Sequence, residues 1–226
     1  MSEGKSRVEV LRINTRYLVE IVEEYDFCPW AKRVRKTPRF RREILWGDSD
    51  NSSLHENIGR YVEEIAQASE VEIALLIFPK LKLSARDFRS LVATVGKTHA
   101  AAHPRGELPL AMACFHPSAE ADMQTAARLV PFIRRSPDPT IQLVRRETIA
   151  KVSNADSASG GSVFADNLES FLPLLSTPPK PSLSDRIAQT NLDTVERVSA
   201  AHIESILADI AADRDRSYAI ADSEDS

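Results

Sequence analysis

Apolar residues near the start of the chain recur at the spacing of an amphipathic helix. Charged residues fill the positions between them, and Val19 is the one apolar residue that falls off the stripe. Proline disfavours helical geometry in the residue before it, so Pro29 predicts that this helix ends near residues 26–28. The stripe consists of Val10, Ile13, Tyr17, Leu18, Ile21, Val22 and Tyr25.

Beyond this helix, short apolar runs alternate with segments of helical periodicity. The run at 71–78 is almost continuously apolar, which is typical of a central strand buried on both faces. Ser84 predicts the N-cap of a helix that ends near residue 103. The pattern predicts an α/β fold, with a mixed sheet of about four strands and helices packed on it. The other three strands are expected at 40–46, 108–115 and 141–144. A further helix is expected from Leu54 to Ile65, and a short helix followed by a loop is expected within 118–139.

The C-terminal part has a different pattern. Residues 182–213 carry an apolar stripe that drifts around the helix, and this stripe must be covered by the domain or by a second chain. A Ser- and Gly-rich stretch at 153–162 and a Pro-rich spacer at 177–181 precede it. We therefore expect an α/β domain at 1–152, a linker and Pro-rich spacer at 153–181, and a helical C-terminal extension with an acidic tail at 182–226.

Composition narrows the class of protein without identifying a function. The 226 residues carry a formal net charge of −4, so nucleic acid is not an expected partner. No apolar run approaches the length of a membrane span, and the first residues lack the apolar core of a signal peptide. The two cysteines, Cys28 and Cys114, exclude a disulfide framework. These features predict a cytoplasmic protein that does not associate with a membrane.

The end of the third predicted strand carries the first candidate site residue. Side chains alternate across a strand, so Cys114 and His116 share a face with Leu110 and Met112. Sheets of α/β proteins commonly bind ligands at strand ends, which makes His116 a candidate general acid or base. The alternative is a histidine that only binds a backbone carbonyl, and core packing is the expected role of Cys114.

Cys28 is a second candidate because Lys32 and Arg33 follow it closely, and nearby cations lower a thiol pKa. It also follows the C-terminal end of a helix, where the dipole works against a thiolate, so a structural cysteine is the alternative. His99 and His103 are four residues apart, as in half of a metal site, but no third ligand can be named. No metal or other cofactor is expected.

Basic residues cluster between 32 and 42 and again between 134 and 151. Arginine forms bidentate pairs with phosphate or carboxylate, so Arg134, Arg135, Ser136 and Arg145 are candidate anion-binding residues. A solvated basic face is the alternative. Asp138 and Glu147 are internal carboxylates that could pair with the two adjacent arginines. The sequence contains none of the common nucleotide-binding, protease or hydrolase motifs.

Three segments resemble a family known as domain of unknown function 1415. These segments are Phe27-Cys28-Pro29-Trp30-Ala31, Cys114-Phe115-His116-Pro117 and Arg135-Ser136-Pro137-Asp138-Pro139. The resemblance covers about residues 8–150 and implies a soluble bacterial α/β protein without an assigned reaction. The sequence departs from the family pattern at several positions, so a divergent member is indicated. These positions are Arg134 for Asn, Asp138 for Tyr, Gln142 for His, and Arg146 in place of an acidic residue.

Two functional hypotheses follow, and the sequence does not decide whether the protein is an enzyme. The first is a protein that binds or acts on an anionic small molecule where His116, Arg135 and Arg145 converge, with Cys28 close by. The second is a non-catalytic interaction protein that docks on a partner, or forms a homo-oligomer, through residues 182–213.

Overall fold

The computed structural model describes residues 2–28, 30–47, 54–103, 109–121, 124–151 and 183–223. Four strands form one mixed sheet in the order β1-β2-β4-β3. The β1–β2 pair is parallel, whereas β2–β4 and β4–β3 are antiparallel. This confirms the predicted fold class. The strands are β1 (Phe40–Ile44), β2 (Ile73–Ile77), β3 (Leu110–Phe115) and β4 (Thr140–Arg145).

β2 is an inner strand, and every one of its residues is buried. The prediction of a central strand at 71–78 is therefore confirmed, although the paired part is shorter than the apolar run. Val71 and Phe78 lie just outside the ladder and are also buried. Their burial explains why the apolar run continues beyond the strand.

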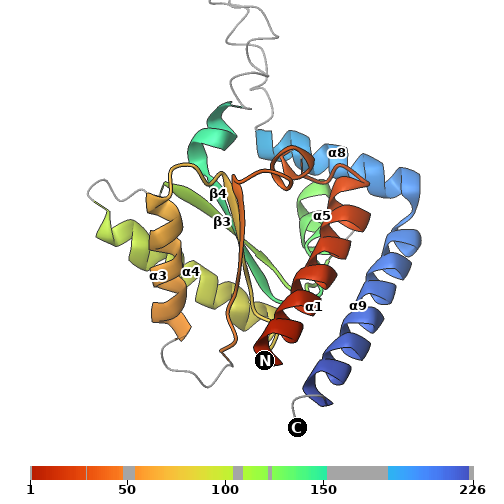
Figure 1. Ribbon diagram of the computed structural model, residues 1–226. Helices are drawn as coiled ribbons and strands as arrows, with labels where there is room; N and C mark the ends of the chain where they lie inside the picture. The colour runs from red at the N-terminus through yellow and green to blue at the C-terminus, as the bar shows by residue number, and fades with distance from the viewer. Residues whose placement is uncertain are drawn as a thin grey trace, which may run out of the picture.

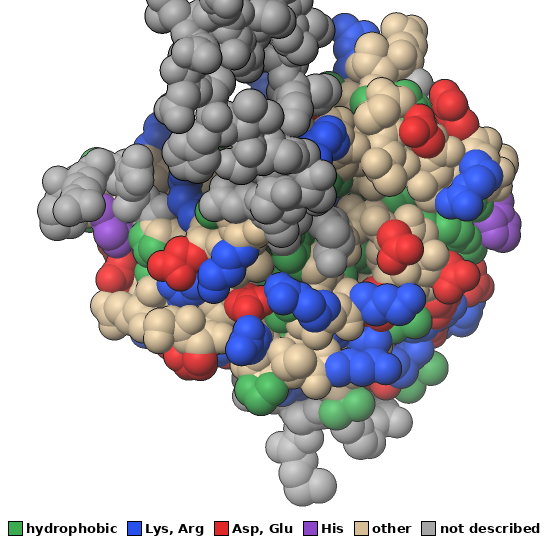
Figure 2. Space-filling model, turned by 90° about the horizontal axis from the view of Figure 1, so that it is seen from above, with side chains coloured by type: hydrophobic (Ala, Val, Ile, Leu, Met, Phe, Trp, Pro, Cys, Tyr) green, Lys and Arg blue, Asp and Glu red, His purple; other side chains and the backbone are tan. Residues whose placement is uncertain are grey.

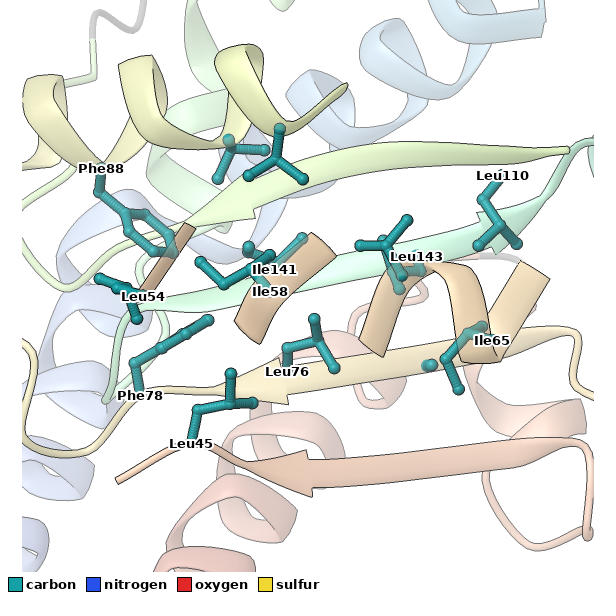
Figure 3. Close-up of a cluster of buried hydrophobic side chains, with 14 of the residues drawn as sticks. Leu45, Leu54, Ile58, Ile65, Leu76, Phe78, Phe88, Leu110, Ile141 and Leu143 are labelled. Atoms are coloured by element: carbon teal, nitrogen blue, oxygen red, sulfur yellow. The ribbon is translucent and has the colours of Figure 1, made fainter. Parts of the chain in front are cut away.

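Two helices cover one face of the sheet, α3 (Leu54–Gln67) and α4 (Ala85–Ala102) (Figure 1). The Ser84 side chain caps α4 by accepting a hydrogen bond from the Asp87 N–H, as predicted. Aliphatic and aromatic side chains from both helices interlock with those of β2 and β4 (Figure 3). Fully buried members of this cluster include Ile58, Phe88 and Ile141.

The opposite face is covered by a larger helical layer (Figure 1). Its core joins Ile13 and Ile21 to Leu75, Ile77 and Leu129. The layer therefore combines residues from both ends of the chain. Its helices are α1 (Ser2–Tyr17), η1 (Leu18–Glu23), α5 (Ala126–Ile133), α8 (Leu183–Val198) and α9 (Ala200–Ser223).

The first helix changes its winding at Leu18 and continues as the wider π-helix η1. The Glu24 N–H donates to the Val19 carbonyl, five residues back, at 3.1 Å. This wider turn keeps Leu18, Ile21 and Val22 buried and leaves Val19 exposed, which explains why Val19 departs from the apolar stripe. π-turns of this kind are frequently found next to functional sites.

The C-terminal extension consists of two helices instead of the single helix predicted at 182–213. The chain breaks at Ser199, which adopts a positive φ of 83°, and α9 then runs on to Ser223. This break explains why the apolar stripe drifts. Val195, Ile203 and Ile210 are buried in the same core cluster as Ile13, so the domain itself covers the stripe.

Smaller differences occur at the edges of the elements. A short helix, α2 (Ala31–Val34), precedes β1, and a further helical segment covers 146–151. Ser52 and Ser53, either of which could cap the helix that begins at Leu54, lie outside the described residues. The Ser- and Gly-rich stretch at 153–162 and the Pro-rich spacer also lie outside them.

Candidate functional site

A cavity of about 570 Å³ lies between the sheet and the helical layer that contains α1, η1, α5 and α8. Side chains alternate between the two faces of a strand, and those on one face of the sheet form the floor of this cavity. Ile73 and Leu75 of β2, Gln142 of β4, and Ala111 and Ala113 of β3 line it. The two alanines leave space where larger side chains would meet the helices, so small residues on β3 help to create the cavity.

The π-turn and the residues that follow it form one wall. Leu18 and Val22 of η1 line the cavity together with Cys28 and Trp30. The Tyr17 hydroxyl donates to the Ile133 carbonyl at 2.7 Å and ties this wall to the end of α5. The opening of the helix at η1 therefore contributes directly to the shape of the cavity.

The C-terminal extension contributes a second wall. Ile187, Ala188 and Asn191 of α8 line the cavity, and α8 packs along α5. The cavity thus includes residues on both sides of the predicted domain boundary at 152. A chain without α8 would have a more open site.

Arg35 and Arg134 are the charged side chains among the described residues that line the cavity. Arg35 forms an ion pair with the buried carboxylate of Glu23, so its charge is balanced. No Asp or Glu is among the described lining residues. The cavity therefore has an excess of positive charge, and this excess belongs to Arg134.

Arg134 is held at the end of α5 by its backbone. Its carbonyl accepts hydrogen bonds from the N–H groups of His116 and Ser136, both at 3.0 Å. Its guanidinium lies over the Phe115 ring, 5.5 Å from the ring centroid. Within the described parts of the chain, no hydrogen bond or ion pair engages this guanidinium. Burial lowers the Arg134 pKa, as expected for a cation with reduced access to water.

Cys28 lines the same cavity as Arg134, but its thiol is not activated. Burial raises the Cys28 pKa, and hydrogen bonds from the backbone N–H groups of Trp30 and Ala31 oppose this effect only in part. The protonated thiol is therefore the form present at neutral pH. Cys28 therefore contributes an uncharged sulfur atom to the wall of the cavity.

His116 lies on the other face of the sheet, packed 5.9 Å from the Phe88 ring. Its Nε2 is 3.0 Å from the Leu83 carbonyl, and its Nδ1 accepts the Ser118 N–H at 3.1 Å. These two bonds require a neutral imidazole with the proton on Nε2. Burial also lowers the His116 pKa, and the side chain holds loop backbone in place instead of facing the cavity.

Arg145 also has a structural role, because its side chain binds backbone carbonyls outside the cavity. Its guanidinium donates to the carbonyls of Val71, Ile65 and Ala68 at 2.7–3.0 Å. These acceptors include carbonyls at the C-terminal end of α3, where helices leave carbonyl groups unsatisfied. Arg145 thus fastens α3 to the sheet and lies outside the cavity.

Arg135 points away from its neighbour Arg134. Its Nε donates to the Ala119 carbonyl at 2.9 Å, and its Nη1 is 3.3 Å from Glu204 of α9. Its guanidinium also lies 5.2 Å from the centroid of Phe132. Arg135 therefore links the loop to the C-terminal extension.

Ser136 and Asp138 complete the loop after α5. Ser136 lines the cavity, and its hydroxyl donates to the Asp138 carbonyl at 2.5 Å. The Asp138 carboxylate accepts hydrogen bonds from Arg214 at 2.6 Å and from the Tyr218 hydroxyl at 2.7 Å. The expected pairing of Asp138 with Arg134 or Arg135 is therefore wrong, because α9 supplies its partners.

The first basic cluster is largely paired with acidic residues. Arg33 and Arg39 both reach Glu72, and Arg41 reaches Glu43 and Glu64. Acidic and basic side chains are interspersed on the face in Figure 2. His99 and His103 lie 3.8 Å and 4.0 Å from Glu63, and no metal-binding cluster is found among the described residues.

The structure thus brings Cys28, Arg134 and Ser136 to one cavity. The predicted convergence of His116, Arg135 and Arg145 does not occur. Sequence reasoning missed other polar residues that line the cavity. These are Asn14, Tyr17, Arg35, Thr140, Gln142 and Asn191. Alternating alanines at 111 and 113, beside larger residues in the same strand, were the available signal.

A family model described as Protein of unknown function (DUF1415) matches residues 9–175. The chain belongs to the DUF1415 family. The DUF1415 match extends past the 8–150 expected from the motifs, and its last part lies outside the described residues. Within the DUF1415 region, Cys28 and the loop at Arg134 border the cavity, whereas His116 lies behind the sheet.

Neither a curated protein nor a solved structure matches this DUF1415 chain. Among the described residues, every helix is too short or too polar to cross a membrane.

Proposed function

We propose that this protein binds a small molecule with an apolar body and an anionic head group in the cavity above β3 and β4. The observation that carries the proposal is Arg134, which lines the cavity without an ion pair to any described residue. Arg134 is half-buried, so its charge is only partly exposed to water, and an anionic ligand would supply the missing counterion.

The size and lining of the cavity support a small-molecule ligand. Its volume of about 570 Å³ lies within the range of about 300–1,000 Å³ common for such sites. Apolar side chains such as Leu18, Leu75 and Ile133 make up much of the lining, with a few polar groups between them. This combination favours an amphipathic anion over a small inorganic ion.

The proposal concerns binding and assigns no reaction. His116, the expected general acid or base, does not reach the cavity. The Cys28 thiol is protonated, since burial raises its pKa. Of the candidate anion-binding residues, Arg134 and Ser136 are therefore kept, whereas the pocket expected at His116, Arg135 and Arg145 and the catalytic role of His116 are not.

The second hypothesis requires an apolar face on the C-terminal extension that remains free for a partner. Val195, Ile203 and Ile210 are the residues that would form this face, and all three are buried in the domain core. A docking function therefore has less support than ligand binding.

Calorimetric titration with a medium-chain carboxylate, decanoate, tests the proposal. We expect decanoate to bind the wild-type protein, and Arg134→Gln to weaken binding by about tenfold or more, the usual effect of losing a charge-assisted hydrogen bond. The neighbouring Arg135→Gln substitution removes the same charge outside the cavity and is expected to preserve binding. Equal binding of decanoate by the wild type and Arg134→Gln would contradict the proposal.

A further inference from the structure

A second hollow, of about 430 Å³, lies on the opposite side of β3 from the cavity. It is bounded by α4 and by the side chains of Leu110, Met112 and Cys114. These residues alternate with Ala111 and Ala113, so they project from the face of the strand that α4 covers. The hollow and the cavity therefore occupy the two faces of the same strand.

The two spaces meet along the outer edge of β3. β3 is the last strand of the sheet, so its outer edge has no neighbouring strand. Met112, Ala113 and Arg134 line both spaces. The Arg134 side chain, which lies over the Phe115 ring, therefore stands at the border of the two spaces. The cavity and the hollow therefore share a border at these three residues.

The charged residues that line the second hollow are all arginines. Arg89 of α4 and Arg146 at the start of the 146–151 segment join Arg134 there, and no described Asp or Glu lines it. In the described parts of the chain, neither Arg89 nor Arg146 forms a side-chain hydrogen bond or an ion pair. This differs from Arg33, Arg39 and Arg41, each of which has an acidic partner.

We infer that the head group of the bound molecule is a phosphate monoester, held at the edge of β3 by Arg89, Arg134 and Arg146 while the apolar chain occupies the cavity. The inference rests on the proposed function and specifies its ligand class. A phosphate monoester carries close to two negative charges at neutral pH and has three strong acceptor oxygens. Three arginines match this charge and this number of acceptors better than they match a single carboxylate.

Titration with decyl phosphate, decanoate and inorganic phosphate tests the inference, with each amphiphile kept below its micelle-forming concentration. We expect decyl phosphate to bind about tenfold more tightly than decanoate and inorganic phosphate to bind more weakly than either. The double variant Arg89→Gln/Arg146→Gln should abolish the preference for decyl phosphate and leave decanoate binding unchanged.

The matched control is Arg86→Gln/Lys97→Gln, which removes two exposed charges from α4 outside the hollow and should keep the preference. Equal affinity of the wild type for decyl phosphate and decanoate would overturn the inference, as would inorganic phosphate binding as tightly as decyl phosphate. If both double variants lose the preference for decyl phosphate equally, the preference comes from the overall charge of the protein, and the inference is also overturned. If neither decanoate nor decyl phosphate binds, the proposed function itself fails.

Discussion

Two adjacent arginines in the loop after α5 have opposite environments. Arg135 contacts the Ala119 carbonyl, Glu204 and the Phe132 ring. Arg134 lies over the Phe115 ring and lines both the cavity and the second hollow. The backbone of Arg134 is fixed by the N–H groups of His116 and Ser136, so its side chain starts from a rigid position. A rigid donor loses little conformational freedom when a ligand binds.

His116 makes the stability of the protein depend on pH. Burial lowers its pKa below the ordinary value of 6.5 in the folded state. The unfolded chain therefore takes up a proton more readily, and the free energy of unfolding should fall as the pH drops below about 6.5.

Urea denaturation at pH 7.5 and pH 5.5 measures this effect. We expect the wild type to lose more stability over this interval than His116→Gln, whose amide can still donate to the Leu83 carbonyl. His202→Gln, at an exposed position on α9, should behave as the wild type does. An identical loss in the wild type and His116→Gln would contradict the assigned role of His116.

The break between α8 and α9 sets the direction of the C-terminal helix. Ser199 adopts φ 83° there, a conformation that is unfavourable for residues with a Cβ atom and accessible to glycine. The break allows α8 to pack on α5 while α9 packs along α1 (Figure 1).

We therefore expect Ser199→Gly to increase the free energy of unfolding by about 0.5–1 kcal/mol, measured by chemical denaturation. Ser199→Ala retains the Cβ atom and serves as the control, with no increase expected. A loss of stability in Ser199→Gly would mean that the greater freedom of glycine in the unfolded chain outweighs the relieved strain.

In the whole molecule, the C-terminal extension and the N-terminal helix stabilise each other. Arg12 and Arg16 of α1 form ion pairs with Asp213 of α9, and Arg16 also reaches Asp209. Ile203 and Ile210 share a core cluster with Ile13. The linker and spacer predicted at 153–181 therefore separate two parts of the sequence that share one buried core.

This arrangement predicts that the full chain unfolds in one cooperative transition. Trp46 packs against the core cluster shared with α8 and α9, and Trp30 lines the cavity, so their fluorescence reports this core, while far-ultraviolet circular dichroism reports the helices themselves. The two signals should change at the same urea concentration. A loss of helical signal at lower urea than the fluorescence change would show that residues 183–223 unfold as a separate unit.

The sequence was sufficient to predict the elements of the sheet and its central strand. The apolar run at 71–78 and the cap at Ser84 are local signals, and each depends on residues near in sequence. The break at Ser199 escaped prediction because serine carries no strong signal for a positive φ.

The site was harder to predict because it depends on side-chain direction and on distant partners. Strand alternation already grouped His116 with Leu110 and Met112, but the sequence did not say which face borders a cavity. Asp138 is paired with Arg214, 76 residues away, and no local pattern identifies that partner. Because Asp138 could not be assigned to Arg214 from the sequence, it remained a possible partner of both Arg134 and Arg135. The sequence therefore did not distinguish these two arginines.

The pairing of α1 with α9 has a consequence for synthesis of the chain. Arg12 and Asp213 are separated by 201 residues, so the ribosome must add all of these residues after Arg12 before the two side chains can meet. At about 5–20 residues per second, the face of α1 that α9 covers waits roughly 10–40 s for its partner. Until α9 has been synthesised, the apolar residues of α1 that share a core cluster with Ile203 and Ile210 therefore lack this cover.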